Sequence, residues 1–291
     1  MNTKLLQTAL VFSVVSCFSA QAAVIPADGE IHTNCSAVTL NYVGTPADNS
    51  LQQNYNATSC KGMAGNDPDY SYNIGLFGDG LLNGERLNGK DPLFTSYEFA
   101  DWVDVNGDGI DDKPGWIGLA RVEGPGNISY NTVAGVNLHP LFDNNSLGNV
   151  FDLTFSYANG GNLSGDWRLQ VNAAALLAAK ALLGNSYFDH LNIVLKGGTT
   201  GFMSYNFDFN KIFDHHNDEY DTELSLLSNY TLGGSWATTD LLSKKGEQQG
   251  LSHATFAAHD PLTTDVVSAP TTVGLFGLSL LGLVASRRRR Q

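Results

Sequence analysis

Residues 104–112 carry oxygen-bearing side chains at alternate positions, a spacing that suits calcium. The side chains of Asp104, Asn106, Asp108 and Asp112, with the backbone carbonyl of Ile110, fall at positions 1, 3, 5, 9 and 7 of a calcium loop. Gly109 stands at position 6, where the loop turns sharply. Because Ca²⁺ takes six to eight hard oxygen ligands at ~2.4 Å, this spacing predicts a structural Ca²⁺ ion that braces a loop.

A full EF-hand is excluded, because position 12 is Gly115 and an EF-hand needs a bidentate Glu there. The loop resembles the shorter calcium loops of dockerins and thrombospondin repeats more closely. A missing ligand could then come from Asp101 or Glu123. The alternative is a solvated acidic turn in a chain rich in Asp, Asn and Gly.

A second cluster of polar residues lies at residues 214–221, in the sequence DHHNDEYD. Imidazoles beside carboxylates can hold Zn²⁺ or Cu²⁺, but His215 and His216 are adjacent and point in different directions. No HExxH spacing is present. We therefore expect a polar loop here. His253, in an apolar context, is expected to satisfy backbone groups within or beside a strand.

The sequence contains no recognised catalytic motif. It has no GxSxG elbow, no phosphate-binding loop and no GxGxxG before a helix, so we expect no catalytic activity. Two alternatives stay open: a calcium-braced, lectin-like carbohydrate-binding module and, less favoured, a secreted glycoside hydrolase. Four tryptophans could stack on sugar rings, although packing in a core is the favoured role: Trp102, Trp116, Trp167 and Trp236.

The elements that would position these residues are mostly strands, because apolar and polar residues alternate along much of the chain. The pattern predicts strands at residues 38–43, 116–122, 128–133, 151–157, 167–171, 191–196, 203–209 and 252–257. Residues 173–183 are strong helix formers and predict one short crossover helix. Short strands separated by Gly, Asn, Asp and Pro indicate an all-β fold, an antiparallel β-sandwich of jelly-roll or lectin-like type.

The amino terminus has the form of a signal peptide. Lys4 precedes an apolar stretch at residues 5–15, and Ala20 and Ala22 frame a small-x-small site, which predicts cleavage between Ala22 and Ala23. The alternative is a lipoprotein signal at Cys17.

The carboxyl terminus combines an apolar segment at residues 273–285 with four arginines: Arg287, Arg288, Arg289 and Arg290. Each buried Arg costs ~2.5–3.5 kcal/mol to insert, so this cluster stays in the cytoplasm and the body lies outside. Thirteen helical residues span only about 20 Å of a ~30 Å hydrocarbon core, which favours a transient transmembrane stop over the alternative, a retained anchor. The predicted organisation is a signal peptide (1–22), an extracellular domain (23–262), a linker (263–267) and a sorting tail (268–291).

This tail resembles the sorting signal of PEP-CTERM proteins. The family pattern Val-Pro-Glu-Pro-Ser-Thr matches here at Val267, Pro270, Thr271 and Thr272, whereas Ser268 and Ala269 replace its first Pro and its Glu. The body resembles such proteins more loosely, at motifs that include residues 165–167 and 195–198. The resemblance implies an exported cell-surface or matrix protein that is processed by signal peptidase and an exosortase-type transpeptidase, in bacteria that make exopolysaccharide and biofilm.

Charge and cysteine content agree with export. Removing Lys4 and the four terminal arginines from the 16 basic residues leaves 11 against 29 acidic residues, so the body carries a net charge of about −18. Nucleic acid is excluded as a partner, because a phosphate backbone needs a basic surface. Cys17 leaves with the leader, and the remaining pair, Cys35 and Cys60, is predicted to form a disulfide; no CxxC indicates a metal site instead.

Overall fold

The structure, a computed structural model, describes residues 28–44, 50–64, 116–131, 146–172, 188–198, 201–226 and 231–259. Its strands are β1 (Asp28–Gly44), β2 (Ser50–Ala64), β3 (Trp116–Val122), β4 (Ile128–Tyr130), β5 (Phe151–Phe155), β6 (Ser164–Val171), β7 (His190–Gly197), β8 (Gly201–Asp208), β9 (Thr231–Ala237) and β10 (Leu251–His259). The helix α2 (Phe209–Tyr220) and the 3-10 turns η4 (Leu147–Asn149) and η5 (Ala158–Gly160) complete the described elements.

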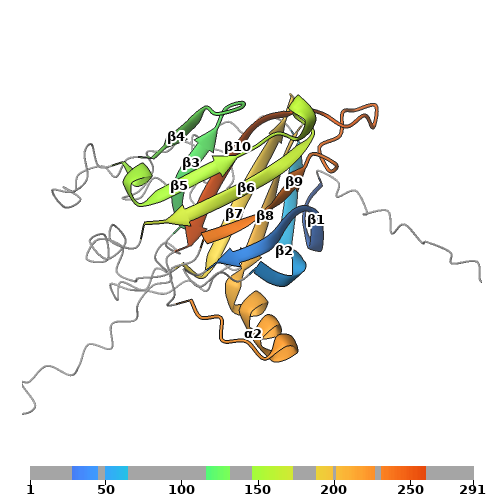
Figure 1. The fold of residues 1–291 in the computed structure, drawn as a ribbon. Coiled ribbons are helices and arrows are strands. Elements are labelled where there is room, and N and C mark those ends of the chain that lie inside the picture. Colours follow the sequence, from blue (N-terminus) through green and yellow to red (C-terminus); the bar gives the residue numbers. More distant parts are fainter. Residues whose placement is uncertain are drawn as a thin grey trace, which may run out of the picture.

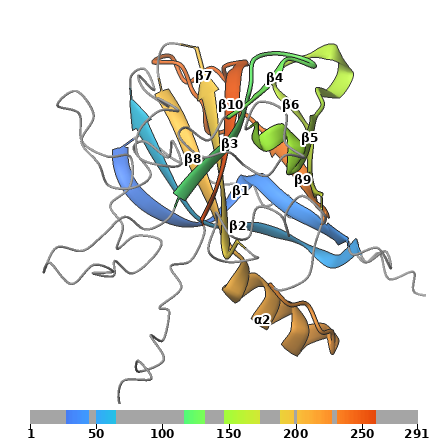
Figure 2. The same cartoon turned by 90° about the vertical axis from the view of Figure 1, so that its left-hand side faces the viewer.

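All these strands belong to one antiparallel sheet in the order β4-β3-β10-β7-β8-β2-β1-β9-β6-β5. The sheet curves until its two ends approach each other and nearly close (Figures 1 and 2). At this seam the backbone N–H of Leu153 on β5 donates to the hydroxyl of Tyr130 on β4, at 2.8 Å. The predicted antiparallel all-β class is confirmed; a division into two separate sheets is not.

Strands β5 and β6 show why the alternating pattern was informative. Phe151, Leu153 and Phe155 are buried while the residues between them are exposed, and β6 repeats the alternation at Trp167 and Leu169. One face of each strand therefore packs inward and the other meets solvent, as period-two hydrophobicity requires.

The interior of the curved sheet is filled by aromatic rings. Phe155 stacks on Trp236 with ring centroids 4.8 Å apart, and Trp167 contacts Phe256 at 6.0 Å. Trp167 and Trp236 are 2% and 1% exposed, so these two tryptophans form core, as expected, and are not available to stack on sugars. Contacts of Phe155 on β5 and Trp167 on β6 with Phe256 on β10 hold the opposed parts of the sheet together.

Each of these tryptophans faces a glycine on the neighbouring strand. Trp167 on β6 pairs with Gly234 on β9, and its Nε1 donates to the carbonyl of Thr39 at 3.2 Å. A Cβ at Gly234 would lie 1.7 Å from that carbonyl oxygen, so only glycine fits. The same arrangement joins Trp236, Gly165 and the carbonyl of Ser156, with distances of 3.1 Å for the hydrogen bond and 1.8 Å for the added Cβ.

The predicted disulfide between Cys35 and Cys60 is present and joins β1 to β2. Both half-cystines are at most 1% exposed. The bridge therefore lies inside the antiparallel pair formed by the two longest of the described strands. Strands β2 and β9 were not predicted, because their sequences carry many polar residues and glycines.

The expectation of a polar loop at residues 214–221 is wrong, because most of this segment belongs to helix α2. The Asp208 side chain caps the helix by accepting from the backbone N–H of Lys211 at 3.3 Å, and Asp221 ends it in the left-handed conformation. The helix buries one face at i, i+3, i+4 and i+7: Phe209, Ile212, Phe213 and His216. The predicted strand at residues 203–209 hid this pattern, because it took Phe209 as a strand residue.

Several predicted elements lie outside the described residues. They are the signal segment, the crossover helix at residues 173–183, and the apolar tail segment. No helix within the described part of the chain is long and apolar enough to cross a membrane.

Candidate functional site

Strands β7 and β8 are buried on both faces, whereas the alternation of polar and apolar residues at 203–209 predicts one exposed face for β8. One face carries the apolar side chains of the core, including Leu191, Ile193, Tyr205 and Phe207. On the other face, the strand register sets His190 opposite Asp208 on β8 and opposite His259 on β10. We call the side chains of this second face of β7, β8 and β10 the polar face.

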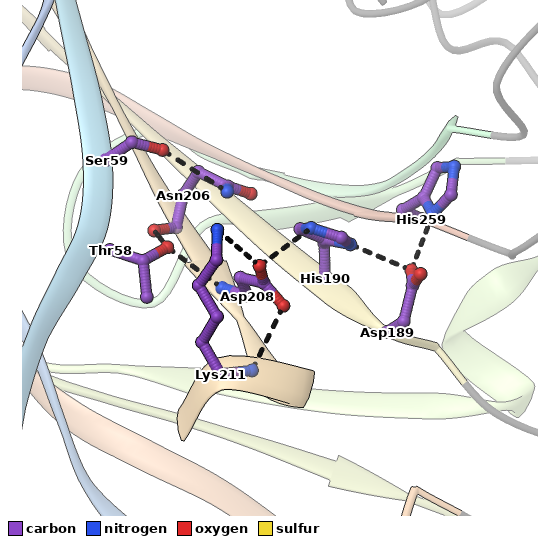
Figure 3. Close-up of polar contacts among 8 residues, drawn as sticks. All are labelled: Thr58, Ser59, Asp189, His190, Asn206, Asp208, Lys211 and His259. Carbon is purple, nitrogen blue, oxygen red and sulfur yellow. Dashed lines mark hydrogen bonds and ion pairs between the residues drawn. The ribbon is translucent and has the colours of Figure 1, made fainter. Parts of the chain in front are cut away.

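Asp189 connects the two histidines at one end of the polar face (Figure 3). Its Oδ1 lies 2.5 Å from Nδ1 of His259 and 2.9 Å from Nδ1 of His190. The backbone holds the same residues together, since the N–H of Asp189 donates to the carbonyl of His259 at 3.2 Å. All three residues are buried, with 9%, 5% and 3% of Asp189, His190 and His259 exposed.

A second carboxylate lies on the other side of His190. Oδ2 of Asp208 is 3.8 Å from Nε2 of His190 and 2.9 Å from Nζ of Lys211 (Figure 3). Asp208 ends β8 and caps α2, so the strand-to-helix junction fixes its position. His190 therefore has one carboxylate near each ring nitrogen.

The electrostatics of this cluster keep Asp189 ionised. Burial alone raises the pKa of the Asp189 carboxyl, but the contacts with His190 and His259, and their positive charge when protonated, lower the pKa to about 2. A buried carboxylate of this kind can hold two imidazoles in position, share a proton with either ring, or join them in binding a cation.

Next to this cluster, the polar face continues with a pair of amides. Asn192 lies opposite Asn206, and its Oδ1 accepts from the hydroxyl of Ser204 at 2.7 Å. Asn206 donates to the hydroxyl of Ser59 at 3.4 Å. Among the described residues, Nδ2 of Asn192, Oδ1 of Asn206 and the hydroxyl of Thr255 are buried without a hydrogen-bond partner. Unsatisfied groups of this kind are unusual in a folded interior.

At the far end of the polar face, Lys196 is 2% exposed. Its ammonium group donates to the carbonyls of Gly197, Gly198 and Gly201 at 3.0, 2.8 and 3.2 Å. These three backbone carbonyls thus replace water around a buried cation.

A separate cleft of about 440 Å³ lies between α2 and the first two strands. Tyr55 is at its centre: the hydroxyl is 2.9 Å from Nδ1 of His216, and the ring packs edge-on against His215. The remaining lining is mostly hydroxyl and amide side chains, together with a lysine: Thr33, Gln53, Asn54, Asn56, Thr58 and Lys211.

The predicted site residues have different outcomes. The calcium residues Asp104, Asn106, Asp108, Ile110 and Asp112, the cleavage site at Ala22 and Ala23, and the tail residues 268–291 lie outside the described residues. Glu123, suggested as an additional calcium ligand, is exposed and accepts from Nε of Arg121 at 2.8 Å. The disulfide pair is confirmed.

Sequence reasoning missed the Asp189, His190 and His259 cluster. The signal available was weak: Asp189 and His190 stand just before the predicted strand at residues 191–196, and His259 follows the one at residues 252–257. Nothing in the sequence says that β7 pairs with β10 in the register that brings these ends together. Within the described residues this is the one group of three or more His, Cys, Asp or Glu side chains whose ligand atoms converge, and residues 214–221 form no such group.

Comparisons with protein-family models, with curated proteins and with solved structures find no match.

Proposed function

We propose that the protein is an exported cell-surface or matrix protein of the PEP-CTERM kind, with a structural role beside exopolysaccharide and no catalytic activity. The observation that carries the proposal is the buried Cys35–Cys60 cystine in a strongly acidic body. Such bridges persist in oxidising compartments and are rare where cellular thiols are kept reduced. In this proposal the leader, cleaved between Ala22 and Ala23, directs export, and the tail with its four arginines directs sorting at the membrane.

In this proposal the body works as two opposed layers. Rings from β5 and β6 pack on Phe256 of β10, which supports a sandwich-like arrangement of the nearly closed sheet. A compact, disulfide-linked β domain resists unfolding and proteolysis outside the cell, which suits a structural role.

Fractionation with intact-mass analysis of the expressed full-length chain tests this route. We expect a product in the envelope or medium that begins at Ala23, lacks the arginine cluster and contains no free thiol. A variant with glutamine at positions 287–290 is the control, because it removes the charges that hold the tail in the cytoplasm and should lose processing. Full-length protein in the cytosol with an uncut leader would overturn the proposal.

Calcium binding at residues 104–112 remains part of the proposal. Saturating Ca²⁺ at 100 times its Kd should stabilise the fold by about 2.7 kcal/mol, because the ion binds only the folded loop. We expect the melting temperature to rise with Ca²⁺ and to fall with chelator, and an Asp104→Asn, Asp108→Asn double variant to lose this response. An unchanged melting curve in wild-type protein would reject the calcium site.

A second candidate function, carbohydrate binding, is favoured by the cleft at Tyr55. Sugar sites commonly combine an aromatic ring with hydroxyl and amide groups, and the described lining holds these. It holds no Asp or Glu, whereas glycoside hydrolysis needs two carboxylates, so the lining favours binding over the hydrolase alternative.

A glycan array probed with and without chelator tests this candidate. Tyr55→Ala should abolish retention of any bound glycan. Tyr42→Ala is the control and should leave retention unchanged, because Tyr42 is half-buried, packs on Arg168 and lies outside the cleft lining. If no glycan is retained, carbohydrate binding is rejected and only the structural role stands. Release of reducing ends from a glycan would instead indicate the hydrolase.

A further inference from the structure

We propose that Asp189, His190 and His259 bind one divalent transition-metal ion of the zinc class. Their candidate ligand atoms all lie within 4.8 Å of one another, and all three residues are buried. They come from the residue before β7, the first residue of β7 and the last residue of β10, which the strand register holds side by side.

The orientation of His190 matches that of a metal ligand. Its Nδ1 lies toward Asp189, and its Nε2 lies toward Asp208, 3.8 Å from the carboxylate. A histidine that ligates through one nitrogen commonly gives its other N–H to a carboxylate, which fixes the ring and strengthens the ligand. Asp208 is itself held by Lys211, at 2.9 Å, and its carboxylate would have to approach the 3.8 Å distant Nε2 by less than about 1 Å to accept this N–H.

Charge also favours a cation at this position. Asp189 is buried, and its side-chain partners within the described residues are the two imidazoles. Lys211 contacts Asp208, on the opposite side of His190. A dication bound between Asp189 and the two rings would pair with this buried carboxylate in place of its contacts with the imidazoles.

The ligand set selects the type of ion. Two imidazole nitrogens and one carboxylate suit Zn²⁺ and its neighbours, whereas Ca²⁺ and Mg²⁺ prefer oxygen alone. This site is therefore distinct from the predicted calcium loop. Ligand atoms around tetrahedral zinc are about 3.3 Å apart, so the Asp189 carboxylate must withdraw by less than about 1 Å from His259 when the ion enters.

Three protein ligands leave a fourth coordination position for water or a small ligand. Asn192 lies one row from His190 on the polar face, and within the described part of the chain its buried Nδ2 has no hydrogen-bond partner. In this proposal its amide donates to the oxygen of a small ligand bound at that position.

Metal titration of the purified mature protein tests the proposal. After removal of metal by chelator, we expect one Zn²⁺ per chain by competition with a chromogenic chelator, unaffected by excess Ca²⁺. Co²⁺ should give the visible absorption of a tetrahedral nitrogen and oxygen site, a readout that needs no variant.

Variants then locate the ion. His259→Gln and Asp189→Asn should abolish stoichiometric binding, and Asp208→Asn should weaken it about 10- to 100-fold by removing the carboxylate behind His190. His253→Gln, on the same strand and face, and a His215→Gln, His216→Gln pair should bind as wild type does.

Absence of Zn²⁺ binding at micromolar concentrations in the wild type overturns the proposal and leaves a hydrogen-bonded cluster only. Stoichiometric binding that survives in folded His259→Gln, or that is lost with His215 and His216, also overturns it.

Discussion

Tyr205 is fully buried, and its hydroxyl donates to Oδ2 of Asp240 at 2.9 Å. Burial, followed by the charge of Asp240, raises the pKa of this hydroxyl well above its ordinary value, so it stays a donor at every physiological pH. Without the Tyr205 hydroxyl, the carboxylate of Asp240, a residue that is 7% exposed, loses a charge-assisted hydrogen bond.

We predict that Tyr205→Phe lowers the free energy of unfolding by about 1.5–3 kcal/mol. Tyr157→Phe is the matched control, because the buried Tyr157 hydroxyl has no hydrogen-bond partner among the residues that the structure describes, so its loss should be neutral or stabilising. Urea unfolding of both variants measures the difference. Equal destabilisation by the two substitutions would show that the contact with Asp240 is unimportant.

His216 provides a pH-dependent contribution at the same scale. Burial, followed by the positive charge of His215, lowers the pKa of His216 below 6.5, and its Nδ1 lies 2.9 Å from the Tyr55 hydroxyl. The unfolded chain therefore takes up this proton more readily than the folded chain. The stabilising effect of neutral His216 is complete above about pH 6.5 and is lost as the pH falls toward the folded-state pKa.

We predict that the difference in unfolding free energy between the wild type and His216→Gln shrinks between pH 7.5 and pH 5. Chemical denaturation at a series of pH values measures it. In a His215→Gln background, which lacks the neighbouring charge, the contribution of His216 to the free energy of unfolding should depend less on pH. A difference that stays constant or grows on acidification would contradict the prediction.

Individual residues differ in how far the sequence exposes their roles. The cystine could be predicted because only two cysteines remain once Cys17, in the predicted leader, is set aside, so no choice of partner was needed. The contact between Asp189 and His259 could not, because it joins residues 70 positions apart. Only the register of β7 on β10 brings them together, and that register depends on packing across the whole sheet.

The close packing of β6 against β9 requires glycine at Gly165 and Gly234, which lie opposite Trp236 and Trp167. Gly234 leaves room for the Thr39 carbonyl, which accepts from the indole of Trp167. An alanine methyl there would contact backbone atoms, which cannot move aside as a flexible side chain can. The strand pair would have to separate to admit it.

We predict that Gly234→Ala and Gly165→Ala each destabilise the protein by about 3 kcal/mol or more, or prevent folding. Gly161→Ala is the control, because its added Cβ would meet the nearest atom at an ordinary 3.7 Å. Thermal unfolding monitored by near-ultraviolet circular dichroism reports the loss, since the tryptophans lie beside the substituted sites. Wild-type stability in Gly234→Ala would show that the strands can part at little cost.

At the level of elements, alternation predicted strands such as β5 and β6 because one of their faces meets solvent. At β8 the same pattern predicted the strand but not its burial on both faces, and it wrongly included Phe209, which begins the helix with buried residues Phe209, Ile212, Phe213 and His216. The Asp208 cap marks the boundary, but it can be recognised only when the strand is ended one residue earlier.

At the scale of the whole molecule, the cystine joins β1 to β2, the two long strands in the middle of the sheet order. Closing a loop with a sequence separation of 25 limits the conformations of the unfolded chain. We predict that a Cys35→Ala, Cys60→Ala double variant loses about 2–4 kcal/mol of stability and that reductant brings the wild type to a similar value. Denaturant unfolding with and without reductant measures both, and a reduced wild type as stable as the oxidised one would contradict the prediction.

The order of strands in the sheet was beyond sequence reasoning. Residue types indicated antiparallel strands and an aromatic core, but β2 pairs with β8 and β10 lies between β3 and β7. These pairings join distant segments, and composition carries no information about which strand is whose neighbour.

The seam between β4 and β5 has a consequence for how copies of this chain associate when they are concentrated, as the proposed matrix role would concentrate them. A long open strand edge offers free N–H groups on which another copy can extend the sheet. At this seam β4 is three residues long, and Tyr130 already accepts the Leu153 N–H of β5. Copies packed side by side would then associate through their side-chain surfaces and avoid fibrous growth by strand addition along this line.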